Sequence, residues 1–111
     1  MSTDCPPPPL PADLPEVLRR IRTTARPSRV ILFGSAARGD ARPDSDLDLL
    51  VIVPAGTHRR HTAQSIYRSL LGIETPVDVV VMTEQDVERY AHTEGLVIAH
   101  ALAEGRLLYA A

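Results

Sequence analysis

Three short apolar segments, separated by stretches with helical periodicity, constrain the fold of this chain most strongly. The segments are residues 30–33, 46–53 and 77–82. Each is followed by a residue that breaks a strand or caps a helix, namely Gly34, Pro54 and Thr83, and short apolar runs bounded in this way are typical of buried strands. Apolar residues at helical spacing mark the stretches 13–26, 63–71 and 83–91. This alternation predicts an α/β domain built on a mixed sheet.

The ends of several elements also follow from the sequence. Asp13 and Glu16 have the spacing of a capping box, with Pro15 in the first turn, so the first helix is expected to begin there and to end before Pro27. Gly72 is expected to end the second helix. The remaining expected elements are a short helical turn over 36–38, a helix over 96–104 and a last edge strand over 106–109.

The N-terminal residues differ from the rest in composition. Residues 6–9 are all proline, and Pro11 follows. Such a run is extended and solvated and has no core to join. We therefore expect a disordered tail over residues 1–12 and one domain over residues 13–111, which is a typical domain length.

Composition narrows the function classes. No apolar run approaches the roughly 20 residues of a membrane span, and the start of the chain lacks the pattern of a signal peptide. Cys5 is the single cysteine, which suits a reducing compartment and predicts a cytoplasmic protein. The net charge of -2 and the 4% aromatic content argue against nucleic acid as a direct ligand. All 12 basic residues are arginine, which excludes lysine-based covalent chemistry.

The segment between the first two apolar runs contains half of a P-loop motif. Gly34 and Gly39 match its two glycines. The lysine and the hydroxyl residue that must follow are replaced by Asp40 and Ala41. Without the lysine the charge of a bound phosphate is not compensated, so this interpretation fails.

The same segment also imitates the start of a calcium-binding EF-hand. Asp44, Asp46 and Asp48 match the first three ligand positions, but the required glycine is Leu49 and the bidentate glutamate is Ala55. The apolar run that follows is typical of a strand rather than of a calcium loop. This interpretation fails as well.

A third interpretation accounts for the polar positions that the other two leave unexplained. Glycine after a strand permits close approach of a ligand, and the Ser35 hydroxyl together with free N–H groups of a following turn can hold a phosphate. Ten residues separate Ser35 from Asp46. Asp46 and Asp48 are two positions apart on a strand, so both carboxylates project from one face while Leu47 and Leu49 point into the core. Adjacent carboxylates repel each other, so this pattern favours a bound cation, and hard oxygen ligands favour magnesium.

A third carboxylate lies in the apolar segment 77–82. Asp78 is the one charged residue of that segment, and a lone buried aspartate is costly unless it is paired or bound to a metal. If this strand neighbours residues 46–53, Asp78 can join the other two acids and form a two-metal site for phosphoryl or nucleotidyl transfer. The structural alternatives are solvated acids at a strand start, an edge position for Asp78 and a helix N-cap role for Ser35.

Together these residues resemble a known signature. Gly-Ser, ten residues, Asp-x-Asp and a later strand aspartate are typical of the minimal nucleotidyltransferase (MNT) domains of the DNA polymerase beta superfamily, and the chain matches them at Gly34, Ser35, Asp46, Asp48 and Asp78. The resemblance covers roughly residues 13–110. It implies a nucleotidyltransferase fold, with a mixed sheet whose helices pack mainly on one face. It also implies ATP as the donor, two Mg²⁺ ions at the three aspartates, and transfer of AMP to a hydroxyl.

The resemblance also suggests a partner. Stand-alone proteins of this size resemble MntA-like antitoxins, which pair with a HEPN-domain toxin and adenylylate one of its tyrosines. It therefore implies a protein adenylyltransferase in a hetero-oligomer. The alternatives are an antitoxin that acts by binding alone and a transferase for a small molecule. Arg38 could reach the triphosphate of the nucleotide, with a solvated surface arginine as the alternative.

The remaining polar candidates are expected to be structural. Tyr67 and Tyr90 fall on apolar helix faces, which predicts that both belong to the core. His58 and His61 have no matching His or Cys cluster and are expected at the surface.

Overall fold

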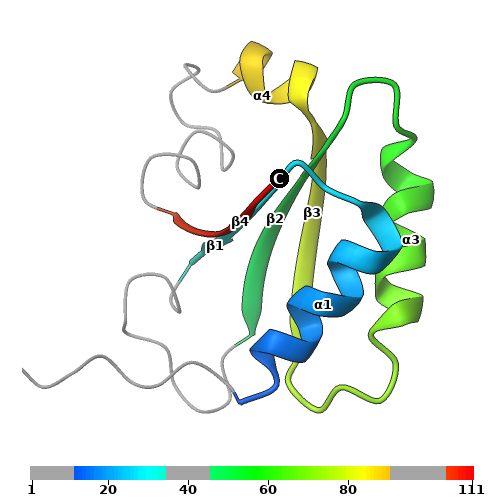
Figure 1. The fold of residues 1–111 in the computed structure, drawn as a ribbon, viewed down its shortest axis with the longest axis vertical. Coiled ribbons are helices and arrows are strands. Elements are labelled where there is room, and N and C mark those ends of the chain that lie inside the picture. Colours follow the sequence, from blue (N-terminus) through cyan, green and yellow to red (C-terminus); the bar gives the residue numbers. More distant parts are fainter. Residues whose placement is uncertain (1–11, 35–45, 91–104) are drawn as a thin grey trace, which may run out of the picture.

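The computed structural model describes residues 12–34, 46–90 and 105–111. Within them the chain forms a four-stranded sheet with the order β3-β2-β1-β4 (Figure 1). The strands are β1 (Arg29–Phe33), β2 (Leu47–Val53), β3 (Val77–Thr83) and β4 (Arg106–Ala110). The helices are α1 (Leu14–Ala25), α3 (Arg59–Ser69) and α4 (Glu84–Tyr90).

The sheet is mixed, as the sequence predicts. β2 and β3 run parallel, whereas β1 is antiparallel to both of its neighbours, β2 and β4. Several expectations lie outside the described residues: the tail before residue 12, the turn over 36–38 with Ser35 and Arg38, and the helix over 96–104. None of the described helices is both long and apolar enough to cross a membrane.

The side chains of β2 alternate between two apolar clusters. Leu47, Leu49, Val51 and Val53 are buried in the larger cluster, which packs against α1 and α3 on one face of the sheet (Figure 1). Leu50 and Ile52 point to the other face, where they pack with Val87 of α4. The prediction that Leu47 and Leu49 point into the core is confirmed. The same alternation places Asp48 on the face that α4 covers.

The predicted capping box at the start of α1 is wrong. Asp13 is the N-cap residue, but its side chain makes no cap hydrogen bond. Its carboxylate instead accepts hydrogen bonds from the hydroxyl and the N–H of Thr75, at 2.8 and 3.3 Å. Glu16 accepts from Arg19 and Arg20, and these hydrogen bonds lower its pKa to about 2. Arginines of the same helix therefore take the Glu16 carboxylate, whereas the tertiary contact of Asp13 with Thr75 ties α1 to the segment that leads into β3.

A cap does form where the sequence places one at Thr83. The N–H of Asp86 donates to the Thr83 hydroxyl at 3.1 Å, and the Thr83 N–H donates to the Asp86 carboxylate at 3.1 Å. The Thr83 N–H and hydroxyl both donate to this carboxylate and hold the pKa of Asp86 below its usual value. This reciprocal pair satisfies N–H groups that the first turn of α4 would leave unbonded.

Replacing Thr83 by alanine is expected to lower the free energy of unfolding by about 1 kcal/mol, because the N-cap hydroxyl is lost. Urea denaturation of the two proteins measures the difference. Thr24→Ala is the matched control, since Thr24 lies exposed within α1 and alanine favours the helix. An equal loss in both variants would contradict a capping role for Thr83.

Candidate active site

Asp48 and Asp78 occupy paired positions on the parallel strands β2 and β3. The register is fixed next to them, where the Leu47 N–H donates to the Pro76 carbonyl at 2.9 Å. Paired residues of neighbouring strands point to the same face of a sheet. Both carboxylates therefore project from the α4 face, at the end of the sheet where β2 and β3 begin.

Gly34 lies directly against Asp48. It follows Phe33, which pairs with Asp48 across β1 and β2, and it adopts a positive φ of +76°. A Cβ at this position would overlap Oδ2 of Asp48 and would lie 3.1 Å from its Cγ. Glycine is therefore needed both for the backbone conformation and for the space that the Asp48 carboxylate occupies.

Two of the three candidate acids, Asp46 and Asp78, are exposed. Asp46 immediately precedes β2 with an exposed side chain, and Asp48 is half-buried. Asp78 is also exposed, so the expectation of a lone buried aspartate is wrong. The reason is the strand order: β3 is an edge strand of the described sheet, and Asp78 lies at its start.

The structure gathers these acids only in part. Asp48 and Asp78 share one face, but no three Asp, Glu, His or Cys side chains in the described ranges are grouped closely enough to hold a metal ion. Like charges repel, so exposed carboxylates converge when a cation neutralises them. A donor set of carboxylate oxygens, with Gly34 leaving room beside Asp48, has the chemistry that a hard divalent cation such as Mg²⁺ requires. The metal-binding role of the three aspartates stays a prediction.

Tyr67 of α3 is a polar neighbour of the site that the sequence interpretation missed. It was predicted in the core but is 42% exposed. Its hydroxyl lies 3.1 Å from Oδ1 of Asp78 and accepts from the Val79 N–H at 2.8 Å. Burial and the negative charge of Asp78 raise the pKa of Tyr67. The sequence does carry one signal for this position, because Tyr67 follows the buried Ile66 at the border of the apolar face of α3. A tyrosine ring at such a border can pack against the core while its hydroxyl reaches outward.

The other predicted structural residues behave as expected. Tyr90 packs, half-buried, against the smaller apolar cluster. His58 and His61 are exposed, and the ring of His58 caps α3 by accepting from the His61 N–H at 3.1 Å.

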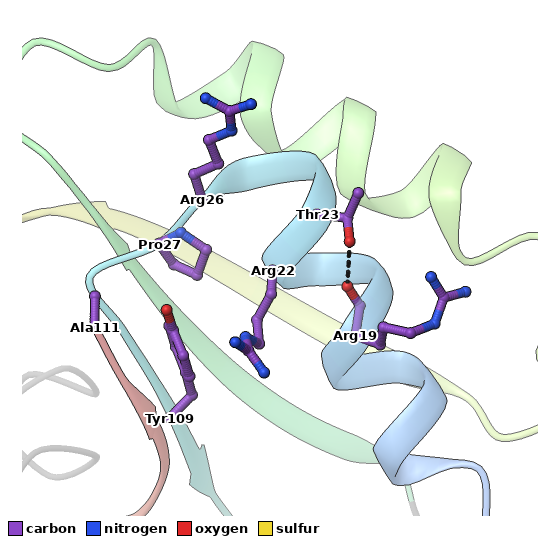
Figure 2. A pocket seen from close by; sticks show the side chains of 7 residues that line it. All are labelled: Arg19, Arg22, Thr23, Arg26, Pro27, Tyr109 and Ala111. Atoms are coloured by element: carbon purple, nitrogen blue, oxygen red, sulfur yellow. Dashed lines mark hydrogen bonds between the residues drawn. The ribbon is translucent and has the colours of Figure 1, made fainter.

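A basic pocket lies apart from the acids, between α1 and the end of β4 (Figure 2). Its volume is about 470 Å³, and its lining residues are Arg19, Arg22, Thr23, Arg26, Pro27, Tyr109 and Ala111. The Arg22 guanidinium stacks on the Tyr109 ring at 4.2 Å, while Arg19 and Arg26 point away from it (Figure 2). Tyr109 pairs with Val30, near the start of β1, whereas Gly34 follows its end. The pocket is therefore separate from the carboxylates, which form the candidate active site.

Comparisons with known proteins agree with the fold. A family model described as a nucleotidyltransferase domain matches residues 14–108. A protein from Sulfolobus solfataricus, described as a candidate nucleotidyltransferase, is similar in structure with a TM-score of 0.59 and 21% identity, over 86% of this chain and 75% of that one. A toxin-antitoxin structure with AMP-PNP is similar with a TM-score of 0.53 and 21% identity, over 86% and 73%. No curated protein matches the chain significantly.

Proposed function

This chain belongs to the nucleotidyltransferase domain family, and we propose that it transfers AMP from ATP to a tyrosine hydroxyl of a HEPN-domain toxin and thereby acts as an antitoxin. The observation that carries the proposal is the pairing of Asp48 with Asp78 on one face of the sheet, beside Gly34. This arrangement places two carboxylates at one end of the sheet, and Gly34 leaves the space that the Asp48 carboxylate occupies.

The residues have distinct roles in this proposal. Asp46, Asp48 and Asp78 would hold two Mg²⁺ ions, which when bound neutralise phosphate charge and lower the pKa of the attacking hydroxyl. Gly34 leaves the space in which the Asp48 carboxylate lies. Ser35 and Arg38, which lie outside the described residues, would contact the phosphates through a hydroxyl and a guanidinium.

The proposed reaction is an in-line displacement at the α-phosphorus of ATP. The tyrosine oxygen forms a bond to that phosphorus, the bond between the phosphorus and the α,β-bridging oxygen breaks, and pyrophosphate leaves with the electron pair. The hydroxyl proton passes to solvent water. Catalysis of such a step depends on positioning and on stabilisation of the phosphate charge, which the cations held by the three aspartates would supply.

Two observations support a protein as the acceptor. A structure similar to this chain is a toxin-antitoxin complex with the ATP analogue AMP-PNP. In addition, the domain is small, and most of its described apolar side chains serve the two core clusters. A partner would therefore complete the enclosure that excludes water from the reacting groups.

The test uses the full chain co-expressed and co-purified with a HEPN-domain protein as the proposed partner. With Mg²⁺, ATP labelled at the α-phosphate is expected to label the partner, whereas ATP labelled at the γ-phosphate is not, because pyrophosphate leaves. A partner with the modified tyrosine replaced by phenylalanine is expected to stay unlabelled.

Other outcomes favour the alternatives. Neutralisation of the toxin without any transfer of label would mean that binding alone explains the antagonism. Labelling of a small hydroxylated compound in place of the partner would indicate a small-molecule transferase.

A further inference from the structure

We propose that Tyr67 is a positioning residue that orients the Asp78 carboxylate toward the cation of the site. The inference rests on the proposed function, because it assumes that Asp78 is a metal ligand. It concerns a residue of α3, on the face of the sheet opposite to α4, whose hydroxyl reaches the open edge of β3.

The Tyr67 hydroxyl is held in place by the backbone of β3. The Val79 N–H donates to it at 2.8 Å, and the Val79 carbonyl lies 3.4 Å away. Since β3 pairs with β2 along its other side, these backbone groups face outward from the described sheet. Tyr67 therefore bonds the outer edge of β3 in the described sheet, and this edge in turn fixes the position of the hydroxyl oxygen.

This fixed hydroxyl contacts one oxygen of Asp78 only. Oδ1 lies 3.1 Å from the Tyr67 oxygen, at hydrogen-bond distance, and in this proposal Oδ2 would be the oxygen that binds the cation. The hydroxyl has a single proton, and the Asp78 carboxylate is its nearer and charged acceptor, since the Val79 carbonyl lies 3.4 Å away. An exposed aspartate at a strand start would otherwise choose among several rotamers, and the bond to Tyr67 selects one of them.

Hydrogen bonds of this kind matter at metal sites. Partners that orient a ligating carboxylate commonly change metal affinity or activity by about 10- to 100-fold when they are removed. A purely structural role for Tyr67, as a clamp on the edge of β3, would instead change stability and leave metal affinity unaltered. Metal affinity and stability are therefore the two quantities to separate.

The experiment measures binding of Mn²⁺ to the full chain in the presence of α,β-methylene-ATP, whose α,β bond cannot be cleaved by the transfer reaction. Tyr67→Phe removes only the hydroxyl and is expected to weaken Mn²⁺ binding about 10- to 100-fold. Tyr109→Phe is the matched control, since this tyrosine lies in the basic pocket away from the acids. Tyr67→His keeps a ring N–H donor and is expected to recover part of the affinity.

The Asp78→Asn variant tests whether Tyr67 affects metal binding through Asp78. It is expected to weaken Mn²⁺ binding, and adding Tyr67→Phe to it is expected to cause no further loss, because Tyr67 acts through Asp78. At saturating metal, transfer by the Tyr67→Phe variant is expected to return close to the wild-type rate.

The outcomes separate the two proposals. Wild-type Mn²⁺ affinity in Tyr67→Phe, or an equal further loss in the Asp78→Asn background, would overturn the positioning role. Equal losses in Tyr67→Phe and Tyr67→His would also overturn it, because the donor would then be irrelevant. If Asp78→Asn itself binds Mn²⁺ as tightly as the wild type, Asp78 is not a ligand, and the proposed function loses its third carboxylate.

Discussion

Replacing Asp46 and Asp48 together by asparagine is expected to abolish nucleotide transfer. The substitution keeps the shape of both side chains and removes two negative charges from the start of β2. A bound divalent cation stabilises the transition state by several kcal/mol, so the loss is expected to reach about a thousandfold or more. Transfer of label from α-labelled ATP to the partner measures it.

The same variant is expected to lose its stabilisation by nucleotide. Mg²⁺-ATP at a hundred times its dissociation constant stabilises a folded protein by about 2.7 kcal/mol, which raises the melting temperature of the wild type. Glu84→Gln with Glu88→Gln is the matched control, because it removes two exposed charges from α4 on the same side of the sheet. If Mg²⁺-ATP still stabilises the asparagine variant, the nucleotide binds elsewhere.

The ends of the strands could be predicted closely because residues beside each end mark it. The second apolar segment was expected over 46–53 and β2 covers Leu47–Val53, since Pro54 cannot continue a strand. The third was expected over 77–82 and β3 covers Val77–Thr83, where Thr83 caps the next helix. These signals lie within a few residues of the boundary that they define, so no tertiary information was needed.

Side-chain partners were predicted poorly because the spacing of two residues does not show which other side chains compete for them. The spacing of Asp13 and Glu16 suggests a local cap, yet Thr75 and the nearby arginines take the two carboxylates. The apolar sequence of β3 likewise suggests burial on both sides, whereas its edge position exposes Asp78. Local pattern cannot show which strand lies at an edge, and the contact of Tyr67 with Asp78 follows from that edge.

The candidate site could be predicted in part, less closely than the strand limits and more closely than the side-chain partners. Strand alternation predicts one face for Asp46 and Asp48, but only Asp48 lies within β2, so their shared face stays a prediction. Asp78 could be expected near Asp48 only if β2 and β3 are neighbours, and their parallel pairing meets this condition. The close contact of Gly34 with Asp48 was not predicted, because it depends on the register of β1 against β2, whose last pair is Phe33 and Asp48.

That contact leads to the second large expected effect, a loss of activity in Gly34→Ala. Alanine at a positive φ costs about 1–2 kcal/mol of stability, and the new Cβ would also occupy the place of the Asp48 carboxylate oxygen. The carboxylate must then move by a substantial fraction of an ångström. Displacements of about 1 Å in a catalytic group can reduce the rate about 100-fold, so transfer is expected to fall by about that factor.

The other two described glycines with a positive φ separate strain from displacement. Gly56 and Gly72 both have a φ of +90°, and a Cβ at either would have no neighbouring atom within 4 Å. Gly56→Ala and Gly72→Ala are therefore expected to lose similar stability to Gly34→Ala and to retain transfer at temperatures where all three are folded. Thermal melting and label transfer, measured on the same samples, give both quantities. Full transfer by folded Gly34→Ala would show that the position of Asp48 tolerates the intruding methyl group, and the carboxylate beside Gly34 would then not be the one that catalysis depends on.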